Sequence, residues 1–245
     1  MSEPALIVED LAKTFTLHTQ GGAGLPVLDG VGLTVTAGEC VALGDPSGAG
    51  KSTLLRAIYG NYRVQRGRVL VRHEGGGEWK GGTLPGFPHP MVDIVTAEAR
   101  RILDVRRCTL GYVSQFLRVI PRVPVVTVVA EPLRALGVAA DEAARRAKAL
   151  LWRLRIPERL WALSPVTFSG GEQQRVNVAR GLVAELPILL LDEPTASLDA
   201  ESRAVVVELI LEARGRGTAI VGAFHDRTVR DAVASRVVFL SEQAA

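Results

Sequence analysis

The chain has 245 residues, 47% of them hydrophobic, and its 29 basic and 26 acidic residues leave a formal net charge of +3. This length and apolar content suit one large α/β domain with a full core. Basic and acidic residues are interspersed, which argues against a basic stripe that binds nucleic acid. The two cysteines lie outside any C-x-x-C motif, which argues against a disulfide or zinc framework. The apolar runs are short, which argues against direct membrane insertion.

The first part of the chain predicts strands around a glycine-rich loop. β-Branched and apolar residues indicate strands at residues 5–8, 31–35, 38–43 and 68–72, and residues 53–58 indicate a helix. Residues 44–53 read GDPSGAGKST, so a loop ending in Gly-Lys-Ser joins a strand to a helix. That strand–loop–helix context is the one in which such a loop binds phosphates.

This loop offers the groups that bind a nucleoside triphosphate and its metal. Its backbone N–H groups can wrap the phosphates, Lys51 can reach the β- and γ-phosphates, and the Ser52 hydroxyl can ligate Mg²⁺. A chance glycine-rich turn is the plainer interpretation, and the flanking strand and helix argue against it. We therefore predict an ATP site at Ser47, Gly48, Ala49, Gly50, Lys51, Ser52 and Thr53.

One residue of the loop departs from the G-x-x-x-x-G-K pattern. Counting back from Lys51, the first glycine position holds Asp45, and Gly44 lies one residue too early. Asp tolerates a left-handed backbone less well than Gly. At an assumed ~8 Å, its charge would repel a phosphate charge by roughly 0.5 kcal/mol in water. We therefore expect Asp45 to weaken ATP binding and Asp45→Gly to strengthen it.

A short strand at residues 110–113 leads into a predicted helical region. Gln115 follows this strand as a neutral polar side chain at a strand end. Asp141 is expected to cap a helix with one apolar face, formed by Ala147, Leu150, Leu151 and Leu154. We place a helical subdomain at about residues 116–166, within a single domain that covers residues 1–245. Residues 81–90 are rich in Gly and Pro and predict a surface loop.

Residues 168–175, FSGGEQQR, predict the start of a helix that can face another molecule. Ser169 and Glu172 fit an S-x-x-E capping box. Gly170 and Gly171 allow the first turn to approach a ligand closely. The free N–H groups and positive dipole end of such a helix suit a phosphate. An ordinary capped helix is the alternative for this segment on its own.

Polar side chains follow two further buried strands. Residues 188–191 form a continuous apolar run, as in a parallel strand buried on both faces, and residues 219–224 predict another. Ligands bind at the carboxyl ends of such strands. Asp192 can therefore hold Mg²⁺ through water, and Glu193 can orient or deprotonate the attacking water. His225 can donate a hydrogen bond to a γ-phosphate.

In this order, the motifs resemble those of an ATP-binding-cassette (ABC) ATPase over essentially the whole chain. The resemblance implies an α/β nucleotide-binding domain with a RecA-like P-loop core, an antiparallel β subdomain and an α-helical subdomain. It identifies Gln115 as a Q-loop residue with a catalytic role and a place at Mg²⁺. It also identifies Phe15 as the aromatic residue that stacks on adenine, and Asp199 as a D-loop residue at the ATP site.

The resemblance further implies a head-to-tail dimer with a second cassette, either an identical chain or a related subunit. ATP and Mg²⁺ would be the cofactors, and each ATP would lie between the phosphate loop of one subunit and the signature helix of the other. The signature residues that act on the partner's ATP would be Ser169, Gly170, Gly171 and Glu172.

Several segments resemble one branch of the family, the PhnL subunits of the bacterial carbon–phosphorus lyase system. They are residues 78–79, 92–97, 99–100, 113–122, 157–161, 167–175 and 224–226. This resemblance implies a cytoplasmic ATPase that works with soluble lyase subunits in phosphonate catabolism. The step implied is the formation of a ribose 1-alkylphosphonate 5-triphosphate, such as ribose 1-methylphosphonate 5-triphosphate, from ATP and an alkylphosphonate.

Two other functions stay open. The sequence EQQR also occurs in exporter-type cassettes, so the chain could be the motor subunit of an ABC membrane transporter, with Gln115 and the residues after it facing a permease. A small-molecule kinase would use the phosphate loop alone. Such a kinase would not need the capped, partner-facing helix that begins at Ser169.

Overall fold

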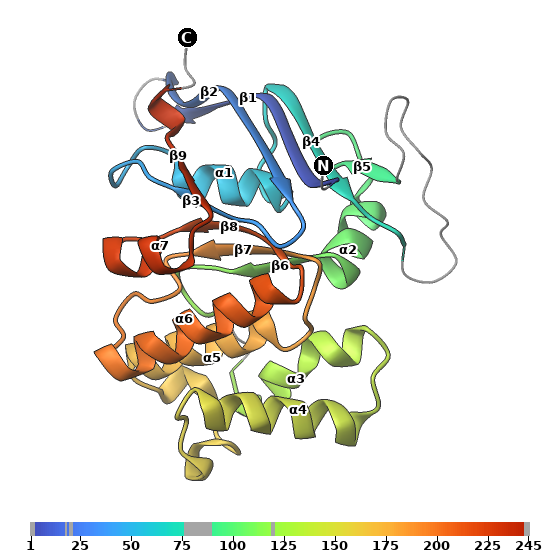
Figure 1. Ribbon diagram of the computed structural model, residues 1–245. Helices are drawn as coiled ribbons and strands as arrows, with labels where there is room; N and C mark the ends of the chain where they lie inside the picture. Colours follow the sequence, from blue (N-terminus) through green and yellow to red (C-terminus); the bar gives the residue numbers. More distant parts are fainter. Residues whose placement is uncertain (1–2, 18, 20–21, 76–89, 119–120, 243–245) are drawn as a thin grey trace.

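Two β-sheets and the helices around them make up the computed structural model, which describes residues 3–17, 19, 22–75, 90–118 and 121–242 (Figure 1). Within these residues, one sheet is antiparallel, in the order β2-β1-β4-β5, and the other is parallel, in the order β6-β7-β8-β3-β9. The antiparallel strands are β1 (Pro4–Leu17), β2 (Ala23–Thr36), β4 (Arg66–Arg72) and β5 (Met91–Asp93). The parallel strands are β3 (Cys40–Leu43), β6 (Leu110–Val113), β7 (Ile188–Asp192), β8 (Ala219–Ala223) and β9 (Arg236–Val238).

The helices cover the parallel sheet from both sides. Helix α1 (Lys51–Ile58) lies between the two sheets, and α2 (Ala99–Cys108) packs beside β6 (Figure 1). On the other side of the parallel sheet lie α5 (Gly170–Leu182) and α6 (Ala200–Gly215), followed by a helical part farther from the sheet. That part contains α3 (Val125–Ala135), α4 (Ala140–Arg153) and the 3₁₀ helices η2 (Glu158–Leu160) and η3 (Pro165–Thr167). Near the C-terminus are α7 (Arg227–Val233) and η4 (Leu240–Glu242).

The predicted α/β architecture, with an antiparallel sheet, a parallel sheet and a helical part, is confirmed. The elements α3, α4 and η2 lie within residues 116–166, and η3 extends one residue beyond them, to Thr167. The glycine-rich residues 81–89 and the segment 78–79 lie outside the described residues. Within the described ranges, no helix has the length and apolar character that a membrane crossing requires.

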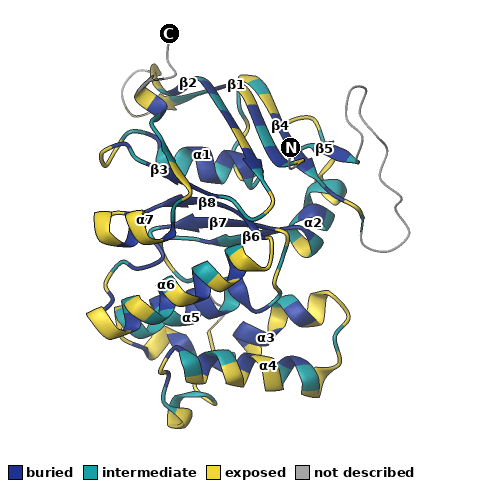
Figure 2. Cartoon of the chain, in the orientation of Figure 1, coloured by how far each residue is buried: buried dark blue, intermediate teal, exposed yellow. Residues whose placement is uncertain are grey.

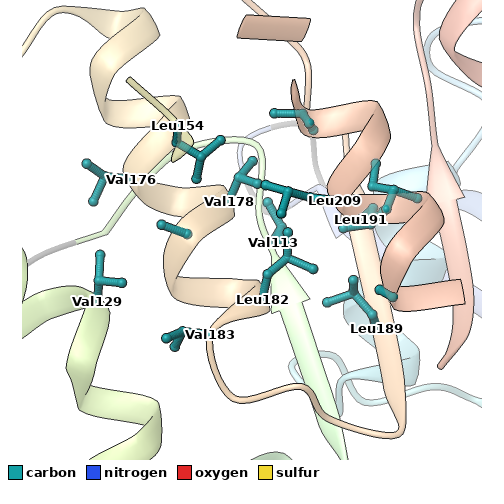
Figure 3. Packing of buried hydrophobic residues seen from close by; sticks show 14 of the residues in the cluster. Val113, Val129, Leu154, Val176, Val178, Leu182, Val183, Leu189, Leu191 and Leu209 are labelled. Carbon is teal, nitrogen blue, oxygen red and sulfur yellow. The ribbon is translucent and has the colours of Figure 1, made fainter. Parts of the chain in front are cut away.

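Alternate residues of the parallel strands belong to two different cores. In β7, Ile188 and Leu190 belong to the core shared with α1 and the antiparallel sheet. Leu189 and Leu191 belong to the core shared with the helices on the other side, where they lie near residues of β6, α5 and α6 (Figure 3). Burial colouring shows β7 and β8 as buried over their lengths (Figure 2). The continuous apolar run in the sequence therefore corresponds to a strand that is covered on both faces.

The prediction that Asp141 caps a helix is wrong. Helix α4 begins one residue earlier, and Ala139, in an extended conformation, occupies the N-cap position. Asp141 therefore lies in the first turn, where its negative charge still favours the positive end of the helix dipole. Of the predicted apolar face, Ala147, Leu151 and Leu154 are inaccessible to solvent, and Leu150 is partly buried against the same core.

We predict that Gly181→Ala destabilises the fold by about 1–3 kcal/mol, because the added methyl group overpacks the core. A Cβ at Gly181 of α5 would lie 2.3 Å from Cγ2 of Val113 in β6. The matched control is Gly215→Ala at the end of α6, where a Cβ would meet nothing within 4 Å. That control should be neutral or stabilising by up to about 1 kcal/mol. Urea unfolding measures both variants, and equal midpoints would contradict the close packing.

Candidate functional site

The candidate site lies at the carboxyl edge of the parallel sheet. The glycine-rich loop follows β3, Asp192 ends β7 with Glu193 next to it, Gln115 follows β6, and His225 follows β8. The ends of β7 and β8 are joined directly, because the N–H of Glu193 donates to the carbonyl oxygen of Ala223 at 3.0 Å. In open parallel sheets this edge is where ligands bind. The fold thus brings the predicted phosphate-binding and catalytic residues to one edge of the sheet.

Two glycines shape the phosphate loop. Gly48 and Gly50 have φ angles of 88° and 93°, a region that glycine adopts without the strain of a side chain. Gly50 is the N-cap of α1, and a Cβ there would lie 2.8 Å from the carbonyl oxygen of Val27. The loop therefore passes close to β2 and delivers the free N–H groups of α1 to its concave side. A helix N-terminus presented in this way suits the phosphates of a nucleotide.

Lys51 is held against the loop that precedes it. Its Nζ donates hydrogen bonds to the carbonyl oxygens of Asp45 and, at 2.8 Å, of Pro46. The ammonium group is thus fixed at the start of α1, beside the loop in which the sequence predicts the phosphates. The side chain of Asp45 points elsewhere, since its carboxylate accepts hydrogen bonds from the backbone at Leu240 and Ser241.

Asp192 is the centre of a polar cluster beneath this loop. It is fully buried. The Ser52 hydroxyl donates to Oδ1 at 2.7 Å, and the Tyr112 hydroxyl donates to Oδ2 at 3.0 Å. A buried carboxylate needs hydrogen bonds and a compensating positive charge, and hydroxyl and carboxylate oxygens are ligands that Mg²⁺ accepts. This donor set therefore fits the predicted Mg²⁺.

The rest of the metal coordination would have to come from the nucleotide and water. Among the described residues, no group of three or more His, Cys, Asp or Glu side chains could hold a metal ion by itself. Mg²⁺ commonly binds to one or two protein groups together with substrate phosphates. The geometry thus matches a metal that enters with ATP.

Tyr112 is a site residue that the sequence pattern did not indicate. Burial and the neighbouring Asp192 charge raise the pKa of its hydroxyl, so Tyr112 remains a hydrogen-bond donor. Hydrogen bonds to Tyr62 and Tyr112 raise the pKa of Arg56, whose side chain comes from α1. The one signal in the sequence was the hydroxyl of Tyr112, which lies in an otherwise apolar strand close to the strand end that Gln115 follows.

Glu193 has a strained backbone that neighbouring groups hold in place. Its φ angle is 53°, a conformation that costs a non-glycine residue about 1–2 kcal/mol. Its carbonyl oxygen accepts hydrogen bonds from Nε2 of Gln174 at 3.2 Å and from the N–H of Ala196 at 3.1 Å. Strain of this kind is found at active sites, where the surroundings fix a side chain for its task. Here the signature helix contributes one of the contacts that position Glu193.

The predicted capping box at the start of α5 is confirmed. The Ser169 hydroxyl accepts from the N–H of Glu172 at 3.4 Å, and the Glu172 carboxylate accepts from the N–H of Ser169 at 2.9 Å. Hydrogen bonds from Ser169 hold the pKa of Glu172 below its usual value. Ser169 and Gly170 are exposed, and a Cβ at Gly170 would meet nothing within 4 Å. The start of this helix therefore has room for another molecule.

The segments that follow Glu193 and β8 are connected to each other. Asp199 is exposed and caps α6, because its carboxylate accepts from the N–H of Ser202 at 2.7 Å. Arg203 donates to the carbonyl oxygen of Leu198 at 3.2 Å and forms an ion pair with Asp226 at 3.1 Å. Because Asp226 follows the exposed His225, Arg203 links the predicted D-loop to the residue that is predicted to donate a hydrogen bond to the γ-phosphate.

Phe15 and Gln115 lie at two other borders of the site. The Phe15 ring in β1 meets the Tyr62 ring edge-on at 5.3 Å, and Nζ of Lys13 lies 4.8 Å from the centre of the Phe15 ring. Gln115 is half-buried, and the carbonyl oxygen of the residue before it accepts a hydrogen bond from the Asn177 side chain of α5. Phe15 thus packs against a residue that follows α1, and Gln115 follows a residue that is hydrogen-bonded to α5.

The histidines without a predicted role divide into two groups. His73 is fully buried, and its ring nitrogens contact Oγ1 of Thr109 at 2.7 Å and Oδ2 of Asp104 at 3.1 Å. It therefore joins β4 to α2 as part of the packing. His18 and His89 lie outside the described residues.

Comparison with known proteins agrees with this geometry. The chain matches the family model described as ABC transporter over residues 28–196. It is 37% identical to the lipoprotein-releasing system ATP-binding protein LolD of Paramagnetospirillum magneticum over 243 residues, which cover 99% of this chain and 97% of that protein. It is 35% identical over 224 residues to an uncharacterised ABC transporter ATP-binding protein of Mycobacterium tuberculosis, covering 91% of this chain and 62% of that protein's length.

Solved structures show the same fold. The dimeric structure of MJ0796, described as a bacterial ABC transporter cassette, has a TM-score of 0.81 and 26% identity and covers 96% of this chain and 93% of its own. The post-hydrolysis dimer of the same cassette, bound to ADP and phosphate, has a TM-score of 0.80. The predicted nucleotide-binding-domain fold is therefore confirmed.

We predict that Tyr112→Phe raises the Mg²⁺ concentration needed for half-maximal ATP turnover by about tenfold, because an outer hydrogen bond to a metal-binding carboxylate is lost. Tyr62→Phe is the matched control, since it removes a hydroxyl that accepts from Arg56 at 2.9 Å. That control should leave the Mg²⁺ dependence unchanged. Nucleotide binding in EDTA should be the same in both variants and the parent. An unchanged Mg²⁺ requirement for Tyr112→Phe would remove this residue from the site.

Proposed function

The chain belongs to the ABC transporter family of ATP-binding proteins, and we propose that it is an ATPase subunit that closes head to tail with a second cassette around ATP. The observation that carries this proposal is the separation of two sets of groups on one chain. Lys51, Ser52 and Asp192 converge at the sheet edge, whereas Ser169 and Gly170 lie exposed at the open N-terminus of α5. The second set is built to approach a phosphate, and the proposed phosphate is the partner's.

Within one cassette, each group of the site has a proposed task. Lys51 and the backbone N–H groups of residues 47–53 bind the phosphates, and Phe15 stacks on adenine. Ser52 and Gln115 would hold Mg²⁺ together with Asp192, which would act through water, and the ion would neutralise developing phosphate charge. Glu193 orients or deprotonates the attacking water. His225, exposed after β8, donates a hydrogen bond to the γ-phosphate.

Across the dimer, the signature and D-loop residues complete the site. Ser169, Gly170, Gly171 and Glu172 bring the helix N-terminus to the partner's γ-phosphate, and Asp199 lies beside them on the next helix. A Cβ at Gly171 would lie 3.1 Å from the carbonyl oxygen of Ser197. This close approach supports joint movement of the signature helix and the D-loop when the dimer closes.

The relatives give more support to a membrane-transport assembly than to the lyase. LolD, with 37% identity over nearly the whole chain, is by its name the ATP-binding protein of a lipoprotein-releasing system. By this likeness, we propose that the chain works as a motor subunit beneath a membrane permease. Phe116, next to Gln115, has 71% of its surface exposed and is one of the residues that would face the permease.

A carbon–phosphorus lyase assembly is the second candidate, and the segments that resemble PhnL support it. In the described structure, residues 113–118 continue from β6 into the exposed Phe116. Residues 157–161 contain η2, in which Glu158 and Arg159 are exposed. These exposed residues could contact soluble lyase subunits. In that case, the chain would be a cytoplasmic subunit of ribose 1-methylphosphonate 5-triphosphate synthase.

Native purification separates the two candidates. A tagged copy would be expressed in its own cell and recovered from detergent-solubilised membranes and from the soluble fraction, with ATP and Mg²⁺ present throughout. A permease in the eluate supports the transport assembly, and soluble lyase subunits without a permease support the second candidate. The untagged strain and the Lys51→Ala variant serve as controls for unspecific and nucleotide-independent capture.

We predict that Glu193→Gln abolishes steady-state turnover and accumulates an ATP-bound dimer, because Glu193 acts on water and contributes little to nucleotide binding. Size-exclusion chromatography with and without ATP measures the dimer. The double variant Lys51→Ala/Glu193→Gln should remain monomeric in ATP, since Lys51→Ala weakens nucleotide binding. A Glu193→Gln variant with parental turnover, or one that stays monomeric when saturated with ATP, would contradict the proposed site.

A further inference from the structure

We propose that Asp45 is a positioning residue that fastens the phosphate loop to the segment after β9, and that this fastening strengthens nucleotide binding. Asp45 occupies the position at which the G-x-x-x-x-G-K pattern has its first glycine. This role of Asp45 depends only on the ATP site shared by the family, and not on the dimer or on either partner assembly.

The carboxylate of Asp45 is turned into the protein. Only 5% of the residue's surface is exposed. Its Oδ2 accepts a hydrogen bond from the N–H of Leu240 at 2.6 Å, and its Oδ1 accepts one from the N–H of Ser241 at 3.1 Å. Although burial opposes ionisation, these hydrogen bonds hold the pKa of Asp45 below its usual value. The negative charge is therefore compensated by backbone donors at the start of η4.

The backbone at this position does not require glycine. Among the described residues, the non-glycine residues with positive φ are Asp10, Arg122, Arg155, Glu185, Glu193 and Ser197. Asp45 is not one of them, so its side chain causes no left-handed strain. The structure thus removes both reasons for expecting Asp45 to weaken ATP binding, namely the backbone penalty and a carboxylate directed at the phosphates.

The same residue also contacts the phosphate-binding lysine. The carbonyl oxygen of Asp45 accepts a hydrogen bond from Nζ of Lys51, and the carbonyl oxygen of Pro46 accepts a second at 2.8 Å. One residue therefore contacts η4 through its side chain and Lys51 through its main chain. A shift of Asp45 would move an acceptor of the lysine that is proposed to reach the β- and γ-phosphates.

The residue before Asp45 is held by the same C-terminal segment. The N–H of Gly44 donates to the carbonyl oxygen of Val238 at 2.9 Å. A Cβ at Gly44 would lie 2.5 Å from Cγ1 of Val237 and 2.7 Å from Cε1 of Phe239. The segment from β9 to η4 therefore packs closely against Gly44 and Asp45, the first two residues of the loop. The hydrogen bonds of the Asp45 carboxylate extend this contact to η4.

This arrangement prepares the loop before nucleotide binds. A loop that is already ordered loses less conformational entropy on binding, so its affinity is higher than that of a loose loop. The contribution should affect binding far more than the chemical step, because Glu193 and His225 are positioned by β7 and β8. Restoring the consensus glycine should therefore weaken ATP binding, which is the opposite of the effect that charge repulsion would produce.

Three variants and a matched control test the fastening. Asp45→Gly and Asp45→Asn remove the charged acceptor. Ser241→Pro removes one donor N–H, and Ser241→Ala retains it. Equilibrium titration with a fluorescent ATP analogue measures the dissociation constant with Mg²⁺ present. Steady-state kinetics separates KM from kcat, and thermal unfolding reports the stability of each variant.

We expect Asp45→Gly and Asp45→Asn to bind nucleotide about three- to tenfold more weakly, because part of the stability contributed by hydrogen bonds to a charged group is expressed as order in the phosphate loop. KM should rise by the same factor, with kcat within about twofold of the parent. The Ser241 hydroxyl also donates a hydrogen bond to the Asp45 carboxylate, and both Ser241 variants lose it. Ser241→Pro should therefore bind nucleotide about two- to threefold more weakly than Ser241→Ala, which keeps the donor N–H. The double variant Asp45→Gly/Ser241→Pro should bind like Asp45→Gly alone, because both changes break the same contact.

Nucleotide binding by Asp45→Gly that equals or exceeds that of the parent would overturn the proposal in favour of charge repulsion. Strictly additive effects in the double variant would also overturn it, since independent contacts give additivity. If Asp45→Gly does not fold, the comparison of Ser241→Pro with Ser241→Ala decides, and equal affinities in that pair would reject the fastening. A lower melting temperature with unchanged nucleotide affinity would likewise limit Asp45 to a structural role.

Discussion

The hydrogen bonds that converge on the Asp192 carboxylate join the parts of this molecule that bind a nucleotide. Ser52 brings the start of α1, Tyr112 brings the end of β6, and Asp192 itself ends β7. Because the carboxylate is fully buried, leaving either oxygen without a donor would be costly. The need to satisfy it therefore fixes the phosphate loop, β6 and β7 relative to one another.

Close packing at three glycines supports the relative positions of the loop and the strands. Gly50 allows the loop to pass against the carbonyl oxygen of Val27, and Gly44 allows it to pass against Val237 and Phe239. Gly181 brings α5 against β6 in the core on the other side of the sheet. At each of these positions a side chain would push an element that carries site residues away from its neighbour. Close packing at these glycines therefore helps to set the positions of the site residues.

The site is divided between groups that face inward and groups that face outward. Hydrogen bonds join Ser52 to Asp192 and Lys51 to the loop. In contrast, Ser169 and His225 are exposed at the ends of elements that pack in the core. Gln174 links α5 to Glu193, and Arg203 links the D-loop to the residue after His225. An event at the outward groups can therefore reach Glu193 through a few short contacts.

Local patterns in the sequence were sufficient for the strand–loop–helix of the phosphate site, the capping box at Ser169 and the buried strand that ends in Asp192. Each of these depends on residues that are close in the chain, where spacing alone sets the geometry. Tertiary structure decided the partners of Tyr112 and Asp45, whose contacts span 80 and 195 residues. Such distances are set only when the sheet and the C-terminal segment assemble. For that reason, an acid that looked like a repulsive charge in the sequence is, in the folded chain, a bound and compensated one.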